Sequence, residues 1–218
     1  MMNRTMKLLM LSDIFVLTGF GLIQPILAIF INEGIPGGTV FAAGFASALF
    51  LMTKSLVQLP FGKYIDGRTR KMRWLILGTL MMAVVPLIYL SADSIYKVYM
   101  AEVIYGIGSG LAYPTWLGLW SMNLDKGRES FQWSVYSTST GLGTAATGAG
   151  GAVVAGFAGF QATFLFAGIM CLLGCAALIV LEMRSSKGAM AEKSTSAPAK
   201  SGKARHATLA YAATLLGL

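Results

Sequence analysis

Six long apolar runs fill most of this 218-residue chain and restrict what it can fold into. A helix that crosses a bilayer needs about 20 mostly apolar residues, and each run is close to that length. With 56% hydrophobic and 12% charged residues, the chain has too little polar surface for a soluble protein of this size. We therefore expect an all-α, polytopic membrane helix bundle in a lipid bilayer, with six transmembrane helices. The runs occupy residues 8–31, 40–59, 74–91, 95–120, 133–158 and 160–182.

The basic residues are distributed unevenly between the runs. All but two of the 17 Lys and Arg residues lie before the first run or after the second, fourth or sixth; the exceptions are Lys54 and Lys97. These positions share one side of the membrane, and the positive-inside rule makes that side cytoplasmic. We expect an integral, multi-pass protein of the plasma (inner) membrane with a cytoplasmic N-terminus and C-terminal tail. The net charge of +8 then reflects topology, and no nucleic-acid partner is expected.

The first and fourth runs contain an internal repeat. Residues 13–25 and 102–114 align at a constant offset of 89, with an acid, two glycines, a leucine and a proline in register. The first run leads outward and the fourth leads inward, so the six helices form a 3+3 unit with inverted topology. Repeats of this kind are typical of secondary transporters, in which two helix sets rock about a central site.

A second motif lies in the loop after the second run, within LPFGKYIDGRTRKMRW, residues 59–74. The loop resembles the signature loop of the major facilitator superfamily, which runs Gly, three residues, Asp, Arg, any residue, Gly, Arg, Arg. It falls between helices two and three, where that family has it. The matching residues are Gly62, Asp66, Arg70 and Lys71, whereas Gly67 and Thr69 replace the family's Arg and Gly.

Two further segments support the resemblance. In the fourth run, EVIYGIGSG resembles the family's pattern of an Arg followed by spaced glycines, with Glu102 in the place of the Arg. In the loop after that run, Asp125 and Arg128 match a recurrent acid and base. The resemblance spans about residues 8–184, the N-terminal six-helix half of a family that normally has twelve helices. It implies secondary active transport of a small solute by alternating access, together with a second six-helix half or a homodimer partner.

The signature loop has a physical interpretation as a conformational latch. Gly62 leaves room for a neighbouring helix end, and Asp66 is suited to cap a helix N-terminus. Arg70 and Lys71 are placed to pair with Asp66 or with Asp125 at the cytoplasmic face. The alternative is that the basic residues only mark topology. The latch residues are Gly62, Asp66, Arg70, Lys71, Asp125 and Arg128.

Three ionisable residues lie inside the apolar runs, where each is costly without a partner or water: Asp13, Lys54 and Glu102. Asp13 and Lys54 have a similar depth, so an ion pair between them is expected. The alternative is that Lys54 extends to the membrane surface and Asp13 lies at the interface. We predict a substrate-binding and coupling site made of Asp13, Gln24, Lys54, Glu102 and Tyr113. Asp13 or Glu102 is the candidate proton carrier, which makes protons a candidate partner.

The fifth run is rich in small residues spaced four apart. Lipid gives helices no hydrophobic reason to associate, so close contact between such stripes holds them together. We predict that Gly143, Gly151 and Gly159 pack against neighbouring helices. The family's antiporter signature needs a Gly-Pro pair in this helix, and this run contains no proline.

Other chemistries have little support in the sequence. The only histidine, His206, lies in the polar tail, so neither a metal site nor a catalytic histidine is expected in the apolar region. Cys171 and Cys175 are four residues apart in an apolar run and are interpreted as packing residues. No enzyme activity and no cofactor are expected. The alternatives to a transporter are a non-transporting scaffold or assembly subunit and, with less support, a membrane-embedded enzyme.

The predicted organisation has three parts. Residues 1–184 form the six-helix transmembrane domain. Residues 185–206, rich in Ser, Ala, Lys and Gly, are expected to be a flexible cytoplasmic linker. Residues 207–218 are apolar but too short to cross a bilayer, so we expect the beginning of a truncated seventh helix or a short interfacial segment.

Overall fold

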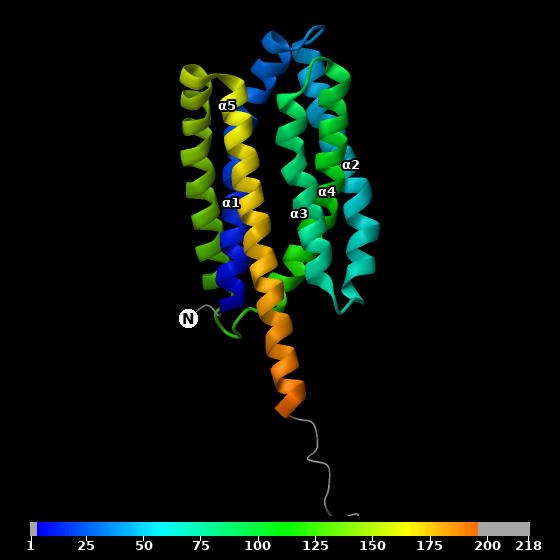
Figure 1. The fold of residues 1–218 in the computed structure, drawn as a ribbon, viewed down its shortest axis with the longest axis vertical. Helices are drawn as coiled ribbons and strands as arrows, with labels where there is room; N and C mark the ends of the chain where they lie inside the picture. Colours follow the sequence, from blue (N-terminus) through cyan, green and yellow to red (C-terminus); the bar gives the residue numbers. More distant parts are fainter. Residues whose placement is uncertain (1–3, 196–218) are drawn as a thin grey trace, which may run out of the picture. The chain divides into compact units, whose positions relative to one another are not determined.

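The computed structural model describes residues 4–195, with side chains for residues 4–184, and all regular structure in that part is helical. The prediction of an all-α bundle is confirmed. Each of the six apolar runs is helical to within one residue of its ends. The helices are α1 (Arg4–Gly34), α2 (Val40–Asp66), α3 (Lys71–Leu90), α4 (Ile95–Met122) and α5 (Glu129–Thr195) (Figure 1).

The last element, α5, is two helical segments joined at one glycine. Gly159 has φ 81° and ψ 170°, a backbone conformation that residues with a side chain rarely adopt. The chain reverses there, so residues 129–158 (olive) and residues 160–182 (yellow) run in opposite directions in Figure 1. Gly159 separates the fifth and sixth apolar runs, and it has a turn role in place of the predicted packing role.

Four helices in the described part of the chain are long and apolar enough to cross a membrane: α1, α2, α3 and α5 up to Arg184. The fourth predicted span, within α4, does not reach the same mean hydropathy. Glycines, tyrosines, tryptophans and Glu102 interrupt its apolar residues. Its 28 residues still span about 42 Å at 1.5 Å per residue, more than the thickness of a bilayer core.

Glycines in α4 let neighbouring helices approach closely. A Cβ atom at Gly108 would lie 2.8 Å from the carbonyl oxygen of Gly78 in α3. A Cβ atom at Gly110 would lie 2.9 Å from the Val57 side chain of α2. Because real Cβ atoms essentially never come so close, only glycine fits at these two positions without a shift of the neighbouring helix. α4 therefore packs tightly against both α2 and α3.

Glycines in α1 have the same role towards the two segments of α5. A Cβ atom at Gly19 would lie 2.7 Å from the carbonyl oxygen of Ala167, in the second segment. Gly21 lies directly against Thr147, in the first segment. α1 is thus held between the two segments of α5 as α4 is held between α2 and α3.

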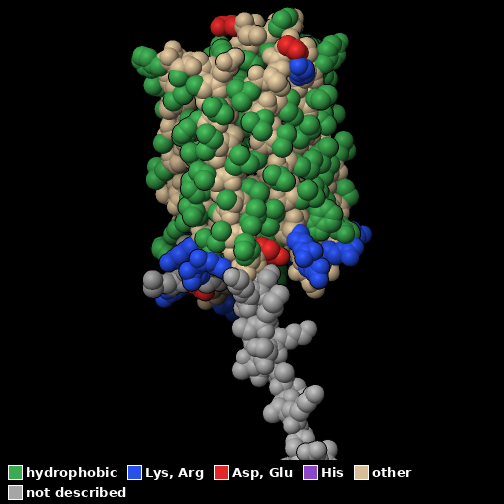
Figure 2. All heavy atoms as spheres, in the orientation of Figure 1, with side chains coloured by type: hydrophobic (Ala, Val, Ile, Leu, Met, Phe, Trp, Pro, Cys, Tyr) green, Lys and Arg blue, Asp and Glu red, His purple; other side chains and the backbone are tan. Residues whose placement is uncertain are grey.

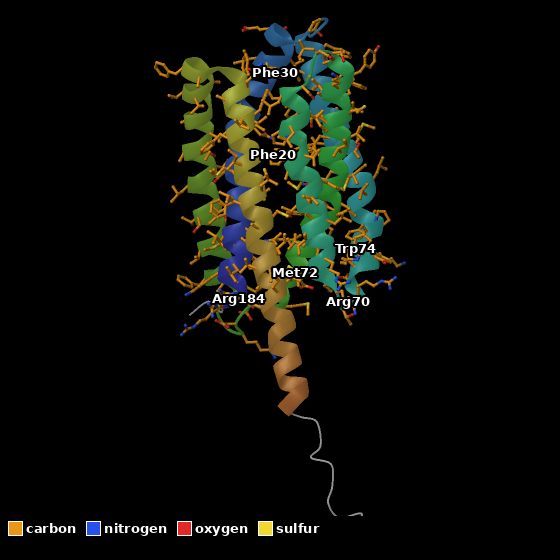
Figure 3. The ribbon with its side chains drawn as sticks, viewed as in Figure 1. Phe20, Phe30, Arg70, Met72, Trp74 and Arg184 are labelled. Atoms are coloured by element: carbon orange, nitrogen blue, oxygen red, sulfur yellow. The ribbon has the colours of Figure 1, made fainter. Side chains whose placement is uncertain are left out.

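Lys and Arg side chains gather at one end of the described bundle, and hydrophobic side chains cover the flank visible in Figure 2. This basic end contains the α2–α3 loop, residues 67–70, and the α4–α5 loop, residues 123–128. The same end carries Arg70 in Figure 3, well away from Phe30 near the other end. The basic residues that the sequence places before the first run and after the second and fourth runs therefore lie at one end of the bundle.

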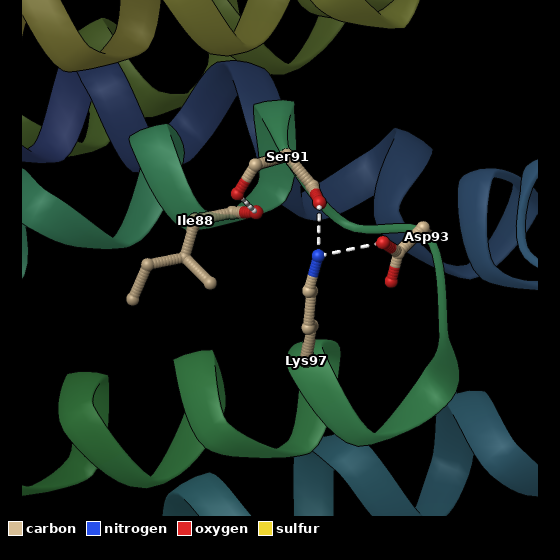
Figure 4. A network of polar contacts seen from close by, with 4 residues as sticks. All are labelled: Ile88, Ser91, Asp93 and Lys97. Carbon is tan, nitrogen blue, oxygen red and sulfur yellow. Dashed lines mark hydrogen bonds and ion pairs between the residues drawn. The ribbon is translucent and has the colours of Figure 1, made fainter.

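The opposite end contains the ion pair that the structure records within residues 4–184. Lys97 Nζ lies 2.7 Å from Asp93 Oδ2 and donates a 3.1 Å hydrogen bond to the Ser91 carbonyl (Figure 4). Ser91 Oγ in turn donates to the carbonyl of Ile88. The hydrogen bond from Lys97 holds the pKa of the Asp93 carboxyl below its usual range. These residues close the short α3–α4 connection.

The chain divides into two units at Glu182 and Met183, close to the predicted end of the transmembrane domain at residue 184. The helix α5 continues to Thr195, so the first part of the predicted linker, residues 185–206, is helical. The rest of that linker and the predicted segment 207–218 lie outside the described residues.

Candidate functional site

Two of the cavities between the described helices contain predicted site residues and an acidic side chain, one towards each end of the bundle. The basic-end cavity has a volume of about 200 Å³ and is lined from α1, α2, α3, α4 and the first segment of α5. The far cavity has a volume of about 220 Å³ and is lined from α1, α2, α3 and α4. Both are lined mostly by apolar and aromatic side chains, with a few polar groups, as small-molecule sites usually are.

A stack of three aromatic rings lies between the two cavities. The rings of Phe20 and Tyr105 are 4.1 Å apart and nearly parallel, at 2°. The rings of Tyr105 and Phe50 are 4.2 Å apart at 15°. Phe50 and Tyr105 line both cavities, so the stack forms a shared wall. Figure 3 shows Phe20 partway between Phe30 and the basic end.

The basic-end cavity brings together three of the predicted site residues: Asp13, Lys54 and Tyr113. Tyr136 Oη donates a 2.6 Å hydrogen bond to Asp13 Oδ2. Lys54 Nζ lies 4.7 Å from the centre of the Tyr113 ring and 5.8 Å from that of Phe50, within the range of cation–π attraction. The structure does not form the predicted ion pair between Asp13 and Lys54, because each side chain turns to an aromatic residue of its own.

The far cavity contains the other two predicted site residues, Gln24 and Glu102. Glu102 is only 3% exposed, and Tyr89 Oη donates a 2.7 Å hydrogen bond to its Oε1 atom. Gln24 is an exposed residue at the rim. The structure therefore distributes the predicted site over two cavities, with one inward-facing carboxylate in each.

Five residues of these cavities were missed by the sequence analysis: Phe20, Phe50, Tyr89, Tyr105 and Tyr136. The two tyrosines that bind the carboxylates had a usable signal, because a tyrosine hydroxyl inside an apolar run needs a hydrogen-bond partner. The two phenylalanines had none, since a phenylalanine in an apolar run is ordinarily a packing residue. Tyr105 had no usable signal either, because its role depends on stacking between Phe20 and Phe50, which are distant in sequence.

The signature loop differs in detail from the predicted latch. Asp66 is the last residue of α2 and is exposed. Arg70 occupies the N-cap position of α3, with no side-chain hydrogen bond, so Asp66 does not cap that helix as predicted. Within the described residues, neither Arg70 nor Lys71 forms an ion pair with Asp66 or Asp125. A Cβ atom at Gly62 would lie 3.7 Å from the Pro114 side chain, an ordinary contact.

Asp125 instead organises the beginning of α5. Gln132 Nε2 donates a 2.8 Å hydrogen bond to Asp125 Oδ2, and the Asp125 backbone N–H donates a 2.9 Å bond to Gln132 Oε1. The Arg128 backbone N–H donates to the Asp125 carbonyl, while the Arg128 side chain is exposed. Gln132 is 2% exposed, so this reciprocal pair fixes the loop from within.

An aromatic cluster fills the space beside this loop. Trp116 and Trp120 stack with their rings 5.1 Å apart, and Trp133 and Tyr136 contact both. Trp120 is fully buried, and its indole N–H has no hydrogen-bond partner among the described residues. Trp116 and Tyr136 also line the basic-end cavity, so the cluster forms part of its wall.

The predicted packing glycines of the fifth run differ from one another. Gly151 lies directly against the backbone of Leu22 in α1, which leaves no room for a side chain. A Cβ atom at Gly143 would meet nothing within 4 Å, so this glycine makes no close helix contact among the described residues. Gly159 is the turn described above. No group of three or more His, Cys, Asp or Glu residues within the described part is arranged to hold a metal ion.

Comparison with known proteins gave one family and a set of similar folds. The family model of the Major Facilitator Superfamily matches residues 9–218. The crystal structure of the POT family transporter PepTSo is similar with a TM-score of 0.73 at 14% identity, over 84% of this chain and 38% of that one. An auto inhibited POT family peptide transporter is similar with a TM-score of 0.70, at the same identity and coverage. This chain thus spans about two fifths of their length. No curated protein matches it.

Proposed function

Since the chain belongs to the major facilitator superfamily and is a membrane transporter by that membership, we propose that it moves a small solute by alternating access, as a secondary active transporter. The observation that carries this proposal is the pair of cavities separated by the stack of Phe20, Tyr105 and Phe50. Each cavity contains one inward-facing carboxylate. A solute that passes from one to the other must displace the stack, which is the step that alternating access requires.

We propose that the six helical segments form a 3+3 inverted repeat, and the glycine contacts support this. Gly19 and Gly108 are 89 residues apart, and so are the residues they approach, Ala167 and Gly78. The chain reversal at Gly159 is likewise 89 residues after Arg70, in the α2–α3 loop. Equivalent contacts at one constant offset are expected if residues 4–90 and 95–182 are two copies of one three-helix unit.

We propose that the basic end is cytoplasmic, in the plasma (inner) membrane, and that the signature loop there acts as a latch. Asp66 supports this because it is exposed at the end of α2 and forms no ion pair with the described residues. It is therefore available to a partner outside this unit. The same end of the bundle carries three further basic residues of the proposed latch: Arg70, Lys71 and Arg128.

A second six-helix unit is proposed to complete the transport path. The solved transporters of similar fold are more than twice as long as this chain, which supports a path built between two such units. The second unit is supplied by the rest of a longer chain, by a second copy in a homodimer, or by a separate protein. The substrate and any coupled proton then cross between the two units.

The proposal is tested by measuring from which side each cavity is reached. In a background with Cys171 and Cys175 replaced by Ala, Ser47→Cys reports on the far cavity and Ser109→Cys on the basic-end cavity. In proteoliposomes, an impermeant thiol reagent is expected to label the two positions from opposite sides, in proportions that shift when a transported solute is added.

A scaffold or assembly subunit gives a different result. Labelling that never changes with any solute, together with no counterflow of any solute in the same vesicles, would rule out the transporter. A control position outside the cavities, Ser94→Cys in the α3–α4 connection, should be labelled from one side only under all conditions.

A further inference from the structure

The basic-end cavity contains one carboxylate and one ammonium group that do not pair with each other. Asp13 and Lys54 both line it, and no ion pair joins them within the described residues. Asp13 accepts one hydrogen bond, from Tyr136, although a carboxylate has about four acceptor positions. The three N–H groups of Lys54 face two aromatic rings and donate no recorded hydrogen bond. Both groups retain unused binding capacity.

Two unpaired opposite charges in one cavity select for a particular kind of ligand. A solute with a single positive charge would bind Asp13 and be repelled by Lys54, and a single negative charge would do the reverse. A zwitterion satisfies both groups at once, which removes the cost of leaving either charge unpaired inside a membrane protein. The far cavity differs, because its lining contains Glu102 but no Lys or Arg.

The remaining walls set the size and character of the solute. Tyr105, Tyr113 and Trp116 contribute aromatic faces, and Val16 and Met82 contribute aliphatic ones. The volume of about 200 Å³ is below the roughly 300 Å³ at which cavities begin to hold drug-sized ligands. A small molecule with one compact apolar group fits these walls.

We propose that the basic-end cavity binds an amino-acid-like zwitterion with an apolar side chain. Its ammonium lies at Asp13, its carboxylate at Lys54, and its side chain lies against the aromatic wall. This inference rests on the proposed transport function for its role as substrate recognition, but it assigns a binding site that is testable without transport. Asp13 and Lys54 thereby become the residues that determine the substrate class.

The test uses three probes that share the phenylalanine side chain and differ in charge. L-Phenylalanine is a zwitterion, L-phenylalaninamide has only the ammonium, and N-acetyl-L-phenylalanine has only the carboxylate. Binding to the whole chain in lipid nanodiscs is measured by calorimetry or by the shift in unfolding temperature. We expect the zwitterion to bind about tenfold or more tightly than either singly charged analogue, because each lost charge-assisted hydrogen bond costs about that factor.

Removing the charge of Asp13 or of Lys54 should change which of the three probes binds most tightly. In Asp13→Asn, N-acetyl-L-phenylalanine is expected to bind most tightly of the three probes. In Lys54→Met, L-phenylalaninamide is expected to bind most tightly. A gain for one analogue cannot come from a protein that has failed to fold. Lys54→Arg should keep the zwitterion preference, and Lys97→Met, which removes a cation at the opposite end, should change no preference.

The outcomes separate this inference from the transport proposal. Equal binding of an analogue and the zwitterion overturns the inference, and so does a failure of phenylalanine, leucine and alanine all to bind. If a singly charged analogue shows counterflow while no zwitterion does, the substrate class is wrong and transport stands. If zwitterions bind with the exchanged preferences but neither cavity changes its accessible side, the site stands and transport fails.

Discussion

At the scale of single residues, the two inward-facing carboxylates form a matched pair. Asp13 and Glu102 are related by the 89-residue repeat, they line opposite cavities, and each accepts a hydrogen bond from one tyrosine. Neither has a cationic partner among the described residues. A charged acid inside a membrane protein is costly without a partner, so we propose that proton uptake and release at one of these two sites couples transport to a proton gradient.

The first prediction concerns Glu102. Glu102→Gln keeps a carbonyl oxygen that accepts the hydrogen bond from Tyr89 but cannot carry a proton. We expect the variant to keep exchange of solute between the two sides of a vesicle while losing accumulation driven by a proton gradient. Counterflow and uptake driven by a proton gradient are measured and compared in the same proteoliposomes. Asp93→Asn, which removes the charge of an exposed acid outside both cavities, is the control. Unchanged accumulation by Glu102→Gln would remove this residue from coupling.

At the scale of elements, single contacts decide how closely helices pack and whether the two cavities communicate. The stack takes one ring from each of α1, α2 and α4, so movement of any of these helices changes it. The glycines of α4 hold it close to α2 and α3, and the glycines of α1 hold it close to the two segments of α5. Both features depend on side-chain size more than on polarity.

A second prediction follows for the middle ring of the stack. Tyr105→Ala removes the shared wall and joins the two cavities. We expect Ser47→Cys in the far cavity to become reachable by a thiol reagent from the basic end, where it was protected. Tyr96→Ala, an equal truncation at a position that is 76% exposed, should leave the labelling unchanged. If Tyr105→Ala also leaves it unchanged, the stack is packing and not a barrier.

The third prediction compares two glycines. Gly108→Ala places a methyl group 2.8 Å from the Gly78 carbonyl, so α3 and α4 must separate, and such overpacking costs about 1–3 kcal/mol. Gly143→Ala meets nothing within 4 Å, so the free energy of unfolding should stay the same or rise slightly. Unfolding in mixed detergent micelles measures both. Equal effects of the two substitutions would contradict the packing role assigned to Gly108.

At the scale of the whole molecule, we propose that the basic end and its loop determine how this unit meets a second one. Asp66 ends α2 on the proposed cytoplasmic face without an ion-pair partner among the described residues, and the nearby Lys and Arg residues add positive charge there. An exposed acid within a basic face is a specific docking point for a cation or a helix N-terminus of a partner.

The fourth prediction tests that docking. Asp66→Asn should leave solute affinity nearly unchanged, because the residue is remote from both cavities, while shifting the ratio of labelling at Ser47→Cys and Ser109→Cys. Asp93→Asn removes an exposed acid at the opposite end and should leave the ratio as it is. The same ratio in Asp66→Asn and the unmodified protein would leave the loop as a marker of topology alone.

Much of the arrangement was predictable because hydrophobicity and glycine spacing are properties of the chain itself. The six apolar runs gave the helical segments, and the repeat identified Gly19 and Gly108 by alignment alone. The open position of Gly143 and the turn at Gly159 were not predictable, because a regular spacing of small residues does not distinguish a contact, an open face and a turn. The capping role of Asp66 failed because α3 begins at Lys71, with Arg70 at its N-cap. The pairing of Asp13 with Tyr136 depends on residues 123 positions apart, which no local pattern reveals.

The tryptophan cluster gives this protein a built-in optical probe. Three of its four tryptophans, Trp116, Trp120 and Trp133, lie within one cluster, and Trp116 faces the basic-end cavity. Indoles this close exchange excitation energy, and because Trp116 lines the cavity, their shared emission responds to a polar group that enters it. Ultraviolet fluorescence of the unlabelled chain will therefore follow water entering or leaving that cavity in real time.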